Sequence, residues 1–84
     1  MSKKAKLLAK LKNEPRGFTW AEAVTLMGTC DFEVKSARGG GSGRTFRHKT
    51  TGQKVRLHEP HPQKTLLPYM VEVLIEGLKN AGEL

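Results

Sequence analysis

The chain has 84 residues, enough for one modest hydrophobic core and too few for two independently stable domains. We therefore expect a single domain over residues 1–84. Its 15 Lys and Arg against 8 Asp and Glu give a formal net charge of +7, which favours polyanionic partners, nucleic acid foremost, because phosphate neutralisation releases counterions. The charge also fits a ribosome-associated protein, or one that binds an anionic membrane surface or an acidic protein partner.

The composition argues against a membrane or secreted protein. No stretch approaches the roughly 20 apolar residues that span a bilayer, and residues 1–12 lack the apolar run of a secretion signal. The one cysteine, Cys30, cannot form an internal disulfide, which agrees with a reducing compartment. We expect a cytoplasmic protein in which Cys30 is a small buried residue at the end of a helix.

Residues 2–12 place Leu7, Leu8 and Leu11 at helical spacing among lysines. This pattern predicts a short basic amphipathic helix that stops near Pro15, so that residues 1–14 form an N-terminal helical segment. A membrane-surface role is the alternative to packing on the domain. We expect packing, because three leucines make a narrow apolar stripe.

A second helix is predicted to begin at a capping box. Thr19 is followed three residues later by Glu22, so each side chain can satisfy a free backbone N–H of the first turn. We expect this helix to end by Gly28. Its apolar face would consist of Trp20, Val24 and Met27.

The hydrophobic period then changes to that of β-strands. Apolar and polar residues alternate over about 31–37, 44–49 and 53–58, with Phe46 expected to face the core. The last two strands are joined by a tight turn that contains Gly52. The first two are separated by the glycine-rich segment 38–43, which cannot hold a regular element.

A final helix follows, because apolar residues recur at three and four positions from Leu66 to Leu78. Thr65 is the expected N-cap, Pro68 fits the first turn, and Ala81 with Gly82 gives the stop. The order is helix, helix, three strands, helix, which predicts an α+β fold.

The stretch from Lys35 to Arg56 contains seven cationic residues and no acidic one. A dense positive surface beside exposed backbone amides of a glycine loop is typical of a phosphate site. The loop lacks the Gly-Lys-Ser/Thr ending of a nucleotide-binding motif, so we expect no ATP or NAD. A flexible connection between two strands is the alternative interpretation of the loop.

Three histidines, His48, His58 and His61, fall at or just after the predicted strands. Imidazole titrates near neutrality and suits proton transfer at a ribose 2′-hydroxyl or a leaving 5′-oxygen. A structural role for each, hydrogen-bonded at a strand end, stays equally open. With one distant cysteine and no Cys-x-x-Cys, we expect no zinc site, no other metal and no cofactor.

The sequence resembles the HicA family of toxin–antitoxin systems over residues 18–82. The likeness is carried by GSGRTFRH at 41–48, LHEPHP at 57–62 and LKNAG at 78–82, in that order. The resemblance implies an α+β fold like that of double-stranded-RNA-binding domains, with a three-stranded antiparallel sheet and helices on one face. The segment 1–14 is then an extra N-terminal helix.

The resemblance also implies a toxin that cleaves mRNA without a metal and is neutralised by a HicB-like antitoxin. The family pattern reads Gly-Ser-His with that histidine taken as catalytic, whereas this chain has Gly43 there. Three explanations are open. A neighbouring histidine, His48 or His61, has taken the role, or the protein binds RNA and cuts it slowly or not at all. The third is that the histidine was replaced to reduce the toxicity of the protein.

Our hypothesis is an endoribonuclease that is a monomer when free, with His48 and His61 as candidate catalytic residues. The alternative is an inactive module that binds RNA or the antitoxin. A DNA-binding helix-turn-helix protein fits less well, because the last helix carries Glu72 and Glu76 and only Lys79. The residues expected to bind RNA are Arg38, Gly41, Ser42, Gly43, Arg44, Arg47, Lys54 and Arg56.

Overall fold

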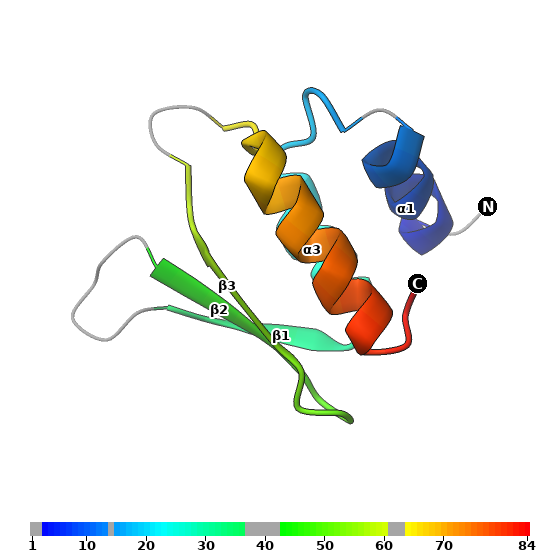
Figure 1. Cartoon of the computed structure of the whole chain (residues 1–84), viewed down its shortest axis with the longest axis vertical. Coiled ribbons are helices and arrows are strands. Elements are labelled where there is room, and N and C mark those ends of the chain that lie inside the picture. Colours follow the sequence, from blue (N-terminus) through cyan, green and yellow to red (C-terminus); the bar gives the residue numbers. More distant parts are fainter. Residues whose placement is uncertain (1–2, 14, 37–42, 61–63) are drawn as a thin grey trace.

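The structure is a computed structural model that describes residues 3–13, 15–36, 43–60 and 64–84. The predicted order of elements is confirmed (Figure 1). In the described part of the chain, no helix is both long enough and apolar enough to cross a bilayer. The elements are α1 (Lys3–Asn13), α2 (Trp20–Thr29), β1 (Phe32–Ser36), β2 (Gly43–His48), β3 (Lys54–His58) and α3 (Pro68–Asn80).

The three strands form one antiparallel sheet in the order β1-β2-β3. Phe46 in the middle strand lies opposite Val34 of β1 and Val55 of β3. Helix α2 packs against β1 and α3 against β3, while α1 packs on α2. Figure 1 shows the helices together on one side of the sheet. This is the expected α+β fold of the double-stranded-RNA-binding type, with a helix before and a helix after three strands.

The core lies between the sheet and the helices because alternate strand residues are apolar and point to one side. Phe46 is buried, and its ring centroid lies 5.6 Å from that of Trp20 in α2. Leu26 of α2 and Leu74 of α3 are fully buried beside it in the same apolar cluster. Burying such side chains removes apolar surface from water, which is the main favourable term in folding.

Helix α1 packs on the domain, as its leucine stripe predicts. Leu11 is buried, and Leu7 and Leu8 are partly buried against the core. Lys10 extends over to α2, where its Nζ lies 2.7 Å from Oε2 of Glu22. Lys3, Lys6 and Lys12 are exposed on the side of α1 that faces water.

Helix α2 begins at the predicted capping box. The Glu22 N–H donates to Oγ1 of Thr19 over 3.1 Å, and the Thr19 N–H donates to Oε1 of Glu22 over 3.0 Å. The expected end at Gly28 is wrong by one residue, because the helix continues to Thr29 and Cys30 is the C-cap. Asp31, the residue after the C-cap, takes the left-handed conformation, with φ 62°, which glycine most often adopts at this position. Cys30 is fully buried, as predicted.

The predicted N-cap of the last helix is wrong. Helix α3 begins at Pro68 and its N-cap is Leu67, which makes no side-chain capping bond. Pro68 explains this start, because the residue before a proline is forced out of the helical region and Leu67 is extended with ψ 156°. Thr65 instead forms an antiparallel bridge with Thr19. The predicted stop is confirmed: Ala81 is the C-cap and Gly82 has φ 78°.

The tight turn between β2 and β3 is also confirmed. Gly52 has φ 78°, and its N–H donates to the His48 carbonyl over 3.0 Å. The His48 N–H donates in return to the Gln53 carbonyl over 2.8 Å. The turn therefore fixes the register of the hairpin, and with it the side of the sheet on which each cation lies.

Candidate nucleic-acid interface

The sheet has an inner face that packs against the helices and an outer face on which the described part of the chain places no helix. Phe32, Phe46, Val55 and Leu57 are buried on the inner face, so the residues that alternate with them point outward. We call these residues the outer face. They are Glu33 and Lys35 of β1, Thr45 and Arg47 of β2, and Lys54, Arg56 and His58 of β3.

The strand register brings the cations of the outer face together. Arg47 lies opposite Lys54 and Glu33, and Thr45 lies opposite Lys35 and Arg56. Neighbouring strands are about 4.8 Å apart, so cations from all three strands share one surface.

One carboxylate, that of Glu33, interrupts this positive surface. Its Oε1 lies 3.7 Å from Nη1 of Arg47, and the two side chains are 40% and 46% exposed. A pair so open to water is weak. The outer face therefore remains positive, with four cations against one carboxylate.

Arg44 lies on the other side of β2 from Arg47. Its side chain is 24% exposed, its Nη2 lies 3.3 Å from Oε1 of Glu59, and its Nη1 donates to the Gly43 carbonyl over 2.9 Å. The expected RNA-binding arginines thus do not all share one face. Arg44 does reach the end of the strand, where it borders the same hollow as Arg56.

This hollow lies where β2 starts and β3 ends. It has a volume of about 260 Å³, and Gly43 lies directly opposite His58 in the register. His58 was one of three histidines noted in the sequence but was not selected as catalytic. The signal that could have placed it with Lys54 and Arg56 is its alternation with the apolar Val55 and Leu57. The lining residues are Gly43, Arg44, Thr45, Arg56, Leu57 and His58.

His48, a catalytic candidate from the sequence, lies on the inner face and is 3% exposed. Its Nδ1 accepts from the Thr51 N–H over 3.1 Å, so the ring proton is on Nε2, which lies 2.9 Å from Oε2 of Glu83. The ring also packs edge-on against Phe32, with centroids 5.0 Å apart. All these contacts are internal to the fold.

Glu83 is held from two sides. Its Oε1 accepts from Lys4 Nζ over 3.0 Å, while Oε2 faces His48. The hydrogen bonds from His48 and Lys4 hold the pKa of Glu83 below its usual 4.5, and the bond to Glu83 raises the pKa of Lys4 above 10.5. Nothing in the sequence signalled this cluster.

Metal-ligand atoms also meet at this cluster. Asp31, His48 and Glu83 each place one such atom within 4.8 Å of the others. The Lys4 ammonium already supplies positive charge to Glu83. The contacts of Lys4 and His48 with Glu83 therefore explain the cluster as a structural connection between α1, β2 and the C-terminal residues. We call these three residues the polar clasp.

Several residues expected at the site lie outside the described residues. They are Arg38, Gly41, Ser42 and His61. The structure therefore brings together Gly43, Arg47, Lys54 and Arg56, with Arg44 at the rim, and separates His48 from them.

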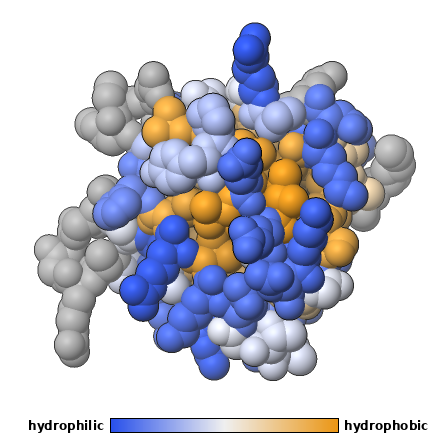
Figure 2. Space-filling view, in the orientation of Figure 1, coloured by the Kyte–Doolittle hydropathy of each residue, from blue (hydrophilic) through white to orange (hydrophobic). Residues whose placement is uncertain are grey.

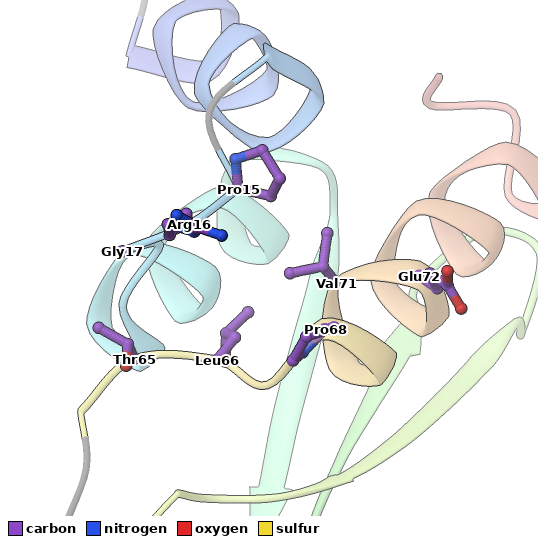
Figure 3. A pocket seen from close by; sticks show the side chains of 8 residues that line it. All are labelled: Pro15, Arg16, Gly17, Thr65, Leu66, Pro68, Val71 and Glu72. Carbon is purple, nitrogen blue, oxygen red and sulfur yellow. The ribbon is translucent and has the colours of Figure 1, made fainter.

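A larger hollow of about 420 Å³ lies at the start of α3, away from the sheet. In Figure 3, Leu66 and Val71 point toward it, whereas Glu72 points away. Leu67 and Tyr69 nearby in the chain are 42% and 52% exposed. Figure 2 shows apolar surface between hydrophilic side chains on the face viewed in Figure 1. The hollow itself is lined by loop and α3 residues and by none of the outer-face residues.

The fold and the site define a small α+β domain of the double-stranded-RNA-binding type that presents a cationic sheet face. The family model described as HicA toxin of bacterial toxin-antitoxin matches residues 20–82. The chain therefore belongs to the HicA toxin family, which implies an antitoxin as its partner. No match was found among curated proteins or among solved structures.

Proposed function

We propose that this protein binds RNA across the outer face of its sheet and cleaves mRNA without a metal. The observation that carries the proposal is the strand register, which gathers Lys35, Arg47, Lys54 and Arg56 on the outer face, away from the described helices. Successive outward residues of one strand are about 6.6 Å apart and strands about 4.8 Å. Cations at these spacings can neutralise several phosphates of one RNA backbone.

Arginine and lysine have different parts in this proposal. The guanidinium groups of Arg47 and Arg56 can each form two parallel hydrogen bonds to one phosphate, whereas Lys54 acts as a point charge. Gly43 lets the RNA backbone come close to the strand. Arg44 contributes from the rim of the hollow. Arg38, Gly41 and Ser42 belong to the proposed surface as expectations from the sequence.

The partner that silences the toxin is proposed to be a HicB-like antitoxin. The proposed location is the cytoplasm, and the free toxin is proposed to be a monomer. A partner that competes with RNA for the outer face would need an acidic surface, because rows of cations there favour opposite charge. Size-exclusion chromatography of the free toxin, and of the toxin with its antitoxin, tests these statements about assembly.

RNA binding is tested by a matched pair of lysine variants. Lys54→Ala removes a cation from the outer face, and Lys12→Ala removes one from the exposed surface of α1. We expect Lys54→Ala to weaken binding of a fluorescent RNA and to lower the slope of log affinity against log salt by about 0.7 to 0.9, with Lys12→Ala near wild type. Equal effects would mean that net charge, and not this face, binds RNA.

A second candidate function is a non-catalytic module that binds RNA or the antitoxin. The observation that favours it is Gly43, which has no side chain to transfer a proton at the position that the family pattern gives to histidine. Induced expression in bacteria separates the two. Growth arrest with loss of full-length transcripts supports the nuclease, and normal growth with intact RNA binding supports the binding module.

A further inference from the structure

His58 occupies a distinctive position at the end of β3. Val55 and Leu57 are buried on the inner face, so the imidazole of His58 points to the outer face, where the residue is exposed. Directly opposite is Gly43, whose side chain is a hydrogen atom.

The groups around His58 are of the kind that bind a phosphodiester and promote its cleavage. His58 borders the hollow of about 260 Å³ together with two guanidinium-bearing residues, Arg44 and Arg56. Arg56 is two residues before His58 on the same strand and points to the same side. Arginine binds the phosphate oxygens and stabilises the negative charge that grows during attack at phosphorus. Imidazole is the side chain that changes protonation near neutral pH.

His48, the other histidine that the structure describes, is poorly placed for proton transfer to RNA. His48 is 3% exposed, and both of its ring nitrogens are engaged by Thr51 and Glu83 on the inner face. RNA bound across the outer face would be on the other side of the sheet from that ring. His58 lies on the same side as the cations.

We propose that His58 is the proton-transfer residue of RNA cleavage, an inference that rests on the proposed function. His58 takes the proton of a ribose 2′-hydroxyl, and the 2′-oxygen forms a bond to the adjacent phosphorus. The bond from phosphorus to the 5′-oxygen breaks, and this oxygen takes a proton from water. The products are a 2′,3′-cyclic phosphate and a 5′-hydroxyl, and Arg56 holds the phosphate throughout.

The experiment measures cleavage and binding of one defined mRNA by four proteins. They are the wild type, His58→Ala, Gly43→His and the control Tyr69→Ala, which truncates an exposed ring on α3. We expect wild type to cut to cyclic-phosphate ends. We expect His58→Ala to cut at least about 100-fold more slowly, the lower end of the contribution of a general base, with RNA affinity within about twofold of wild type. Added imidazole should restore part of the lost rate, which a structural defect would not allow.

The outcomes separate this inference from the proposed function. If wild type binds and cuts RNA and His58→Ala cuts equally fast, the role of His58 is overturned and the nuclease function stands. If only Gly43→His cuts, both the role of His58 and the native nuclease activity are overturned, while RNA binding by the outer face stands. If wild type does not bind RNA, the proposed function itself fails.

Discussion

Nε2 of His48 lies 2.9 Å from Oε2 of Glu83, which joins the middle strand of the sheet to the residues after α3. Lys4 of α1 holds the other carboxylate oxygen over 3.0 Å. One carboxylate thus connects a helix, a strand and the C-terminal residues. Because His48 is buried, its ring donor depends on Glu83 for a hydrogen bond.

Removal of this carboxylate should destabilise the fold. Glu83→Ala leaves the Nε2 proton of His48 without its partner, which costs about 1–3 kcal/mol for a buried donor. Each kcal/mol lowers the melting temperature by about 4–8 °C in a domain of this size. Thermal denaturation measures the shift, with Glu76→Ala on the exposed side of α3 as the control. A control as destabilised as Glu83→Ala would contradict the role of the clasp.

The same clasp should make stability depend on acid pH. Hydrogen bonds from His48 and then Lys4 hold the pKa of Glu83 in the folded protein below 4.5. A group with a lowered pKa stabilises the fold above its unfolded value and loses this contribution as pH falls through its folded value.

The difference in unfolding free energy between wild type and Glu83→Ala should therefore have its largest value above about pH 5.5. It should decrease steadily as pH falls below about 4.5. Urea denaturation at a series of pH values measures it. A difference that stays constant down to pH 3 would show that the carboxylate charge has no part in the clasp.

Two glycines in helices should respond oppositely to the same substitution. A Cβ at Gly77 of α3 would overlap Cγ2 of Val55, whereas a Cβ at Gly28 of α2 meets nothing within 4 Å. Val55 is buried and its β-branched side chain is stiff, so Gly77→Ala should cost about 1–3 kcal/mol.

Gly28→Ala should stabilise by up to about 1 kcal/mol, because alanine is the better helix former. Urea denaturation of both variants gives the comparison. A stabilising effect of Gly77→Ala would mean that α3 does not approach β3 as closely as described.

The thiol of Cys30 should be protected from reagents in the folded protein. It is fully buried at the C-cap of α2, and this burial raises the pKa of the thiol above its usual 9.0. Because the thiolate is the reactive form, modification should require opening of the core. The rate of reaction with a thiol reagent should rise with urea in parallel with unfolding. Rapid, complete reaction in native buffer would show that this end of α2 is open.

Much of the fold was determined by local patterns in the sequence. The capping box at Thr19 and the three-to-four spacing of apolar residues fixed both core helices, because a helix brings such residues to one side. Alternation with a period of two placed Phe46 in the core and Arg47 outside it. These features depend only on residues within one turn or strand. The prediction of Thr65 as the N-cap of α3 failed because Pro68, three residues later, determines where the helix begins.

The tertiary structure alone decided which groups from distant segments meet. His48 and Glu83 are 35 residues apart, and no local period relates them. Gly43 faces His58 only because the turn at Gly52 fixes the hairpin register, and a slip of one residue would send each side chain to the other face. A sequence thus specifies short-range periodicity directly, whereas a site made of cross-strand neighbours exists only after the chain has packed and fixed its register.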